Sequence, residues 1–252
     1  MTNGNVIQSV ETSIEIVEAL YESSPARVSE IAEMTGNSTA NVSKHLNTLE
    51  NHEFVVKNED GYHLGFRYLD IGGLVRENYE RTQIIKPKIL ELTERTGESA
   101  SFFVEEHGSA VVMYREVGKR GVSARSRVGK RLPLHQTAAG KAMLAHMDTA
   151  RIEAIIEENG LEAVTENTIT EKETLFEELR RTRERGYAIN DEESTQGLYA
   201  LAAPIQTASD ELIGACAVPG PTHRMKSETK QQEISEALLS FTNEIELNIS
   251  YL

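Results

Sequence analysis

The 252-residue sequence predicts an α+β fold, with an N-terminal winged helix-turn-helix and a larger C-terminal domain built on a mainly antiparallel sheet. Three short helical patterns followed by a hairpin pattern fill residues 1–65. Strand patterns interspersed with amphipathic helices fill residues 84–252, which is typical of helices packed on an antiparallel sheet. The residues between them, 66–83, read as a linker helix with a weak point at Gly72-Gly73.

Composition narrows the class of protein. Hydrophobic residues make up 39% of the chain, which is enough for packed cores. No apolar run is long enough to span a bilayer and the N-terminus lacks a signal-peptide pattern, so we expect a cytoplasmic protein without membrane association. The single cysteine, Cys216, excludes an intramolecular disulfide and a thiolate zinc cluster.

The chain is strongly acidic, including the segment in which the helix-turn-helix is expected. The formal net charge is −14, and residues 1–80 carry five Lys or Arg against thirteen Asp or Glu. Domains that bind nucleic acid usually show a basic footprint, because neutralising phosphates supplies much of the affinity. Either this segment does not bind DNA, or it works in a cytoplasm salty enough to screen the charge. The spread of Glu over the whole chain favours the second, halophilic interpretation.

The first two helices are expected over residues 6–22 and 28–36. The segment Ser23-Ser24-Pro25 ends the first helix, because proline cannot continue the helical hydrogen bonds. Gly36 suits the left-handed position that closes the second helix. Periodicity predicts which side chains face inward: Val10, Ile14, Val17 and Leu20 in the first helix, and Ile31, Ala32 and Met34 in the second.

The third helix carries the candidate DNA contacts. Ser38 is a good N-cap for it, and Val42, Leu46 and Leu49 form its buried edge. Two helices joined by a tight glycine turn form a helix-turn-helix, although a three-helix packing unit with a solvated polar face would show the same pattern. The outer face and the following segment give the expected DNA-binding residues: Ser38, Thr39, Ala40, Asn41, Ser43, Lys44, Asn47 and Lys57.

A predicted hairpin favours the DNA-binding interpretation. Residues 54–57 and 62–64 read as strands around a turn that contains Asp60-Gly61. A hairpin directly after a recognition helix is a wing, and Lys57 is its natural phosphate contact. We therefore expect double-stranded DNA as a partner.

The second domain shows no enzymatic signature. It contains no GxGxxG, Walker, HExxH or GxSxG motif. We expect His135 to make a structural hydrogen bond, Cys216 to be a small buried hydrophobe, and the acidic run 191–193 to be a solvated loop. The prediction is a protein that is not an enzyme and that needs no cofactor and no metal.

Small residues mark a candidate ligand site. Three strands are expected over 99–106, 109–117 and 122–129, followed by a short helix that Thr137 caps. The helix start at Ala138-Ala139-Gly140 would leave backbone N–H groups accessible and present the positive end of the helix dipole, which suits a small anion. Close packing of this helix on a strand would also require Ala and Gly, so both interpretations stay open.

Two longer stretches carry a family resemblance. VGKRLPLHQTAAGKAMLA, residues 128–145, and RGYAINDEESTQGLYALAAPI, residues 185–205, resemble the two signature regions of IclR-type transcriptional regulators. The resemblance covers nearly the whole chain. It implies a GAF-like effector-binding domain, effectors that are small metabolites such as organic or aromatic acids, and homodimers joined through N-terminal domains and linker helices, often as dimers of dimers.

The resemblance also implies pocket positions. Ala139 and Gly140 match the family's small-residue floor, Asn190 stands where the family is often acidic, and Ala200 stands where a Cys or small residue is frequent. On the last strand Ala217 and Pro219 replace a Ser-x-Ser pattern, which suggests a less polar wall. The expected effector-binding residues are Val122, Arg125, Thr137, Ala139, Gly140, Asn190, Ala200, Ala217 and Pro219.

From these positions we expect an organic acid whose carboxylate rests near Thr137, with Asn190 donating a further hydrogen bond and Arg125 adding a charge. Two other functions compete: a GAF-type redox enzyme that uses the thiol of Cys216, which no second cysteine supports, and a sensor that has lost DNA binding. We expect a homodimer that binds a pseudo-palindromic operator, with Leu69, Leu74 and Val75 at the dimer surface.

Overall fold

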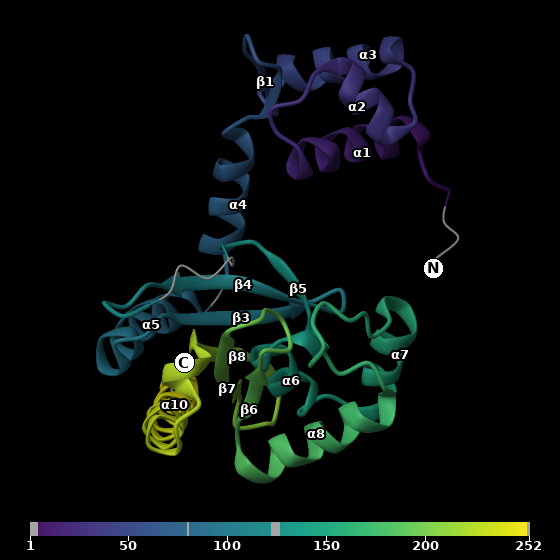
Figure 1. The fold of residues 1–252 in the computed structure, drawn as a ribbon. Coiled ribbons are helices and arrows are strands. Elements are labelled where there is room, and N and C mark those ends of the chain that lie inside the picture. The colour runs from purple at the N-terminus through teal and green to yellow at the C-terminus, as the bar shows by residue number, and fades with distance from the viewer. Residues whose placement is uncertain (1–4, 80, 122–126, 251–252) are drawn as a thin grey trace. The chain divides into compact units, whose positions relative to one another are not determined.

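The computed structural model describes residues 5–79, 81–121 and 127–250, which form two compact units that divide between Asn78 and Tyr79 (Figure 1). Val122 and Arg125 lie outside these described residues, so the structure gives no account of either. No helix within the described ranges is both long enough and apolar enough to span a bilayer.

The first unit is the predicted winged helix-turn-helix. Gly36 takes a left-handed conformation at φ +67° and ends the second helix. The core between the helices and the hairpin includes Ile16, Leu20, Ile31 and Leu46. The elements of this unit are α1 (Gln8–Glu22), α2 (Val28–Thr35), α3 (Thr39–Asn51), β1 (Val55–Lys57), β2 (Tyr62–Leu64) and α4 (Arg67–Glu77).

The prediction for the buried face of α1 is wrong in part. Leu20 is buried as predicted and Val17 is half-buried, but Val10 and Ile14 are each 51% exposed. The helix also buries Thr12, Ile16 and Ala19. Helix α1 carries two apolar stripes, and packing against α2 and α3 selects the one that contains Ile16. In α2 Ile31 and Ala32 are buried as expected, whereas Met34 is 44% exposed.

The linker residues differ from the expectation in detail. Helix α4 runs through Gly72-Gly73 without interruption and ends at Glu77. The next helix, α5 (Thr82–Thr96), begins five residues before Pro87, so this proline lies inside the helix. The expected linker, 66–83, therefore holds α4 and the first residues of α5.

A six-stranded sheet in the order β5-β4-β3-β8-β7-β6 forms the second unit, and all its described pairings are antiparallel, which confirms the predicted α+β class. The expected strand over 122–129 lies mostly outside the described residues, and the described edge strand is 131–133. The strands are β3 (Ala100–Glu106), β4 (Ser109–Glu116), β5 (Arg131–Pro133), β6 (Ala188–Asp191), β7 (Leu198–Gln206) and β8 (Leu212–Pro221).

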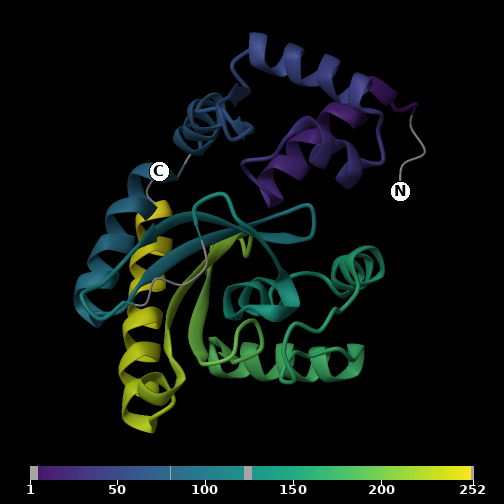
Figure 2. The ribbon, with the colours of Figure 1, turned by 45° about the horizontal axis from the view of Figure 1, so that its top comes forward.

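Helices cover both faces of this sheet (Figure 2). On one face α5 and α10 (Glu228–Ser250) pack on large side chains such as Phe102 and Leu201. The other face carries Ala200, Ala202 and Ala217, on which α6 (Ala138–Leu144) packs closely. The remaining helices are the 3₁₀ turn η1 (Leu134–Gln136), α7 (Thr149–Asn159), α8 (Lys172–Arg185) and α9 (Thr222–Met225).

Close packing explains Gly140. A Cβ atom at this position would lie 2.1 Å from the carbonyl oxygen of Leu134 and 2.5 Å from its Cα. Backbone atoms cannot move aside as the end of a flexible side chain can. Only glycine therefore fits at this position of α6, which packs against the backbone of η1. Of the two interpretations left open by the sequence, close packing accounts for this residue.

We expect Gly140→Ala to destabilise the second unit, because the added methyl group overlaps the backbone of η1. Overpacking of this kind costs about 1–3 kcal/mol. Gly72→Ala is the control, since a Cβ at Gly72 meets nothing within 4 Å and helical Ala is about 0.5–1 kcal/mol better than Gly. Denaturant unfolding of the full chain measures both. A Gly140→Ala protein as stable as the wild type would contradict the close-packing explanation.

Candidate functional site

The recognition helix α3 is held by local bonds at its start. The backbone N–H of Asn41 donates to Ser38 Oγ at 3.2 Å, so Ser38 caps the helix as predicted. Asn41 also donates through Nδ2 to Asn37 Oδ1 at 3.2 Å, which orients its amide. At the middle of the helix His45 Nδ1 lies 2.8 Å from Ser13 Oγ on α1. These contacts fix α3 against the rest of the first unit.

The outer face of α3 presents most of the residues predicted to contact DNA. Thr39, Ala40, Lys44 and Asn47 are exposed, as is the capping Ser38. Asn41 and Ser43 are half-buried at the border of this face. The structure therefore places the predicted residues other than Lys57 on the outer face of α3 or at its border.

The predicted wing is the hairpin formed by β1 and β2. Its turn is closed by a hydrogen bond from Asn58 N–H to the Gly61 carbonyl at 2.9 Å. A pair of hydrogen bonds between Ala26 and Tyr62 joins β2 to the segment before α2. Lys57 is exposed, with its ammonium 5.5 Å from the centre of the Tyr62 ring. Lys57, the predicted phosphate contact of the wing, is therefore accessible at the surface.

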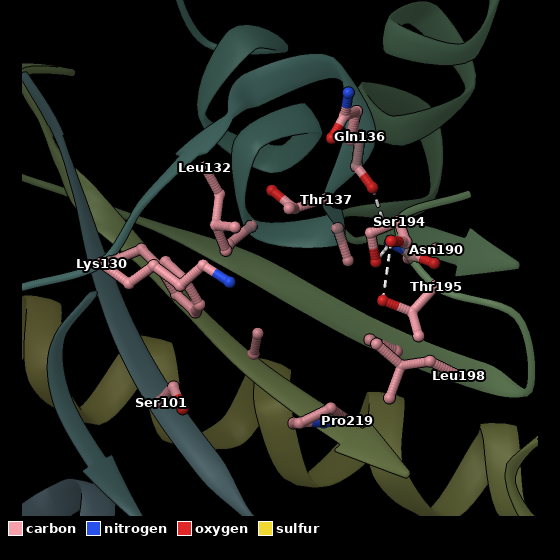
Figure 3. Close-up of a pocket in the computed structure, with 15 residues that line it drawn as sticks. Ser101, Lys130, Leu132, Gln136, Thr137, Asn190, Ser194, Thr195, Leu198 and Pro219 are labelled. Carbon is pink, nitrogen blue, oxygen red and sulfur yellow. Dashed lines mark hydrogen bonds between the residues drawn. The ribbon is translucent and has the colours of Figure 1, made fainter. Parts of the chain in front are cut away.

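The second unit contains a cavity of about 230 Å³ between its sheet and the start of α6 (Figure 3). Six of the nine predicted effector residues line it: Thr137, Ala139, Asn190, Ala200, Ala217 and Pro219. Gly140 does not line it, and Val122 and Arg125 are outside the described residues. The other lining residues are Ser101, Phe103, Lys130, Leu132, Gln136, Ala138, Ser194, Thr195 and Leu198.

Among the described residues that line this cavity, Lys130 carries a positive charge. Its side chain is half-buried and its amino group points into the cavity (Figure 3). Sequence reasoning assigned the charge to Arg125 and missed Lys130, because its direction depends on the unpredicted edge strand β5. At the start of α6 the Gly140 N–H donates to Thr137 Oγ1 at 2.9 Å, while Ala138 and Ala139 occupy the first helical positions, whose N–H groups have no acceptor one turn back.

Asn190 lines the cavity, and its side-chain amide is hydrogen-bonded within the protein, so its expected bond to a ligand stays a prediction. Its Nδ2 atom donates to the Gln136 carbonyl at 2.7 Å and to Ser194 Oγ at 2.9 Å. Its Oδ1 atom accepts from the Glu193 N–H at 3.1 Å. Both amide protons are therefore used within the cavity wall, and Asn190 joins η1 to the loop after β6.

A buried ion pair supports the same loop. Lys141 on α6 is 1% exposed, and its Nζ atom lies 2.5 and 2.6 Å from the two carboxylate oxygens of Glu193. Burial raises the pKa of Glu193, and the adjacent Lys141 ammonium opposes that rise. The expectation of a solvated acidic loop is wrong here, since Glu193 is buried and Asp191 pairs with Lys226 at 2.7 Å. The partners Lys141 and Lys226 are distant in the sequence, so these ion pairs could not be predicted from it.

Neither His135 nor Cys216 has the surroundings of a catalytic group. His135 Nε2 lies 3.1 Å from the Glu162 carbonyl, and burial lowers the pKa of its imidazole. Cys216 is fully buried on the face opposite the cavity, and burial raises the pKa of its thiol. Both are structural residues, as expected. Within the described ranges no group of three His, Cys, Asp or Glu residues is placed to hold a metal ion.

Comparison with known families and curated proteins agrees with this architecture. Residues 77–247 match the family "Bacterial transcriptional regulator IclR C-terminal", and residues 11–57 match "Bacterial regulatory protein, arsR family", a helix-turn-helix group. The HTH-type transcriptional regulator XynR of Escherichia coli is 31% identical over 223 residues, which are 87% of this chain and 88% of that protein. Because such relatives are regulators, the expectation that the chain is not an enzyme is confirmed.

Solved structures show the same fold. The Thermotoga maritima IclR structure is 26% identical, has a TM-score of 0.78, and aligns over 97% of this chain and 99% of its own. An IclR homologue from Microbacterium hydrocarbonoxydans complexed with 4-hydroxybenzoate has a TM-score of 0.75 at 20% identity, over 94% of this chain and 98% of its own. The family match covers well over half of the chain, and the chain belongs to the IclR family of transcriptional regulators.

Proposed function

We propose that this IclR-family regulator recognises a specific operator through α3 and that a small organic acid in the cavity of the second unit controls its operator binding or activity. The observation that carries the proposal is the cavity, in which Lys130 and the start of α6 face an otherwise largely apolar wall. The exposed polar face of α3 supplies the DNA-reading half.

The DNA contacts divide by chemistry. Lys44 and Lys57 suit phosphates, and Asn41 and Asn47 carry the amides that read base edges in the major groove. Since residues 1–80 are strongly acidic, we infer that binding takes place in a halophilic cytoplasm, where molar salt screens the repulsion from DNA phosphates.

Lys44→Ala should weaken binding of the operator and of scrambled DNA by similar factors, because a phosphate contact carries no sequence information. Asn41→Ala should instead relax base choice by about 1–3 kcal/mol at one position, if its contact is bidentate. Gel shifts in molar KCl, with the upstream DNA of the gene and a scrambled duplex, measure both effects. Lys86→Ala and Asn51→Ala are matched controls, since Lys86 lies on α5 and Asn51 at the far end of α3.

Equal losses on both duplexes for Asn41→Ala would contradict its base-reading role. A wild-type protein that binds neither duplex at any salt concentration would favour the competing function, a sensor that acts through protein contacts.

We also propose that the protein is at least a homodimer and that it reads a pseudo-palindromic operator. Two recognition helices on one DNA supply the specificity that a few base pairs cannot. Helix α4 presents Leu69, Leu74 and Val75, which are 72%, 59% and 65% exposed in the single chain. Val10 and Ile14, the outward stripe of α1, add apolar surface in the same unit. Apolar surface on this scale is typical of an interaction site.

Leu69→Lys combined with Val75→Lys should shift the protein from dimer to a monomer of 28.0 kDa, because two buried charges at the interface would lack partners. Val164→Lys is the control, since Val164 is 54% exposed and belongs to the second unit, whereas α4 belongs to the first. Light scattering at micromolar concentration in high salt measures the mass. A wild-type monomer under these conditions would contradict the dimer.

The organic-acid proposal follows from the contents of the cavity. Lys130 offers a charge-assisted contact to a carboxylate, and Ala200 and Ala217 leave apolar space for a carbon skeleton. The volume lies below the roughly 300–1,000 Å³ of pockets for drug-sized ligands, which favours a small metabolite. The homologue complexed with 4-hydroxybenzoate shows that an IclR-type protein binds an organic acid, which supports this class for the present chain.

Lys130→Gln should weaken binding of small carboxylates at least about tenfold, because a charge-assisted contact contributes about 1.5–3 kcal/mol. The control is Lys86→Gln, which removes an equal charge from an exposed position on α5. Calorimetric titration of the full-length protein with a panel of acids measures affinity. Equal binding by the two variants and the wild type would place the carboxylate elsewhere.

A further inference from the structure

Ser101 is a buried polar side chain whose hydroxyl has no partner. The residue is 1% exposed and lies on β3, where it lines the cavity. Its Oγ atom has no hydrogen-bond partner among the described residues. A serine hydroxyl carries one donor and two acceptor positions, and all three are unmet in the protein.

The sheet register shows why this hydroxyl stands apart. Ser101 pairs with Ala217 on β8, and its neighbour Phe102 points to the opposite face, into the core beneath α5 and α10. On the cavity side the adjacent side chains of Phe103 and Ala217 are apolar. On β4 the residue that pairs with Ser101 is Arg115, so Ser101 has both apolar and charged neighbours on its face of the sheet. It lies across the cavity from Asn190 and Ser194 (Figure 3).

Packing gives no reason for a hydroxyl at this position. An alanine would occupy the same place on β3 without burying a polar group, and burial of an unpaired hydroxyl is unfavourable. The cavity wall differs in this respect, since Asn190 and Ser194 are joined by a hydrogen bond of 2.9 Å. None of the described residues meets the hydrogen bond of Ser101, and the residue lines the cavity, so a molecule bound there is the candidate partner.

We propose that Ser101 is a specificity-determining residue that hydrogen-bonds an oxygen substituent of the effector. The ligand class is then a hydroxy or oxo carboxylic acid, with its carboxylate at Lys130 and a second oxygen at Ser101. This inference rests on the proposed effector site, and it adds a second polar anchor to that site. An acid without the second oxygen would displace any solvent from Ser101 and leave its hydroxyl unpaired, so the site rejects it.

Matched pairs of acids test the inference on the full-length protein in molar KCl. The probes are propanoate against lactate and pyruvate, butanoate against its 3- and 4-hydroxy derivatives, and benzoate against its three monohydroxy derivatives. Calorimetric titration gives the affinity of each for the wild type, Ser101→Ala and Ser101→Cys. The control is Thr222→Val, which removes another buried, unpartnered hydroxyl of the same unit that does not line the cavity.

We expect the wild type and Thr222→Val to bind at least one oxygen-substituted acid about tenfold more tightly than its unsubstituted partner. Ser101→Ala should bring the two within about twofold, by weakening the substituted acid alone. Ser101→Cys, with a weak donor of similar size, should lie between them. Ser101→Ala should unfold at or above the wild-type temperature, since the change removes a buried unpaired group.

Two negative outcomes distinguish the role of Ser101 from the existence of the organic-acid site. If acids bind in a Lys130-dependent way but Ser101→Ala and Ser101→Cys keep the wild-type preference, or the wild type shows no preference, the role of Ser101 is overturned and the effector site stands. If no acid of the panel binds the wild type, the organic-acid site itself fails, and the inference fails with it.

Discussion

The wall of the cavity in the second unit depends on the buried ion pair between Lys141 and Glu193. Lys141 belongs to α6, whose first turn lines the cavity, and Glu193 immediately precedes the lining residues Ser194 and Thr195. Glu178 on α8 lies 4.0 Å from the same ammonium and pairs with Arg185 at 2.6 Å, so the charges form a network. Removing one partner of a buried pair typically costs about 3–5 kcal/mol, because the other charge is left uncompensated.

Asn190 reinforces the same junction without charge. Its bonds to the Gln136 carbonyl and Ser194 join η1, directly before α6, to the loop after β6. The loop after β6 is therefore connected twice, to α6 by the ion pair and to η1 by the amide of Asn190. Such connections hold a binding site in one shape before the ligand arrives, which reduces the entropy lost on binding.

Local patterns were predictable from the sequence, and long-range partners were not. Gly36 and the Ser38 cap are set by neighbouring residues, so the helix-turn-helix could be read directly. Helix α1 has two apolar stripes, and only packing against α2 and α3 decides which is buried. Four of the six predicted cavity residues lie in the two resembling stretches, and Ala217 and Pro219 came from the family's pattern on the last strand. The inward placement of Lys130 and Ser101 depends on how distant segments fold around the cavity.

Successive side chains of β8 point alternately into the hydrophobic core and into the cavity. Cys216 and Val218 face the core beneath α10, while Ala217 and Pro219 face the cavity. Substitutions at the second pair reshape the ligand space and leave the hydrophobic core as it is. Ala200 on β7 adds a further small side chain to the cavity wall. Single substitutions at these positions can therefore change the cavity volume in small steps. Relatives with this strand pattern can diverge in what they sense while keeping one scaffold.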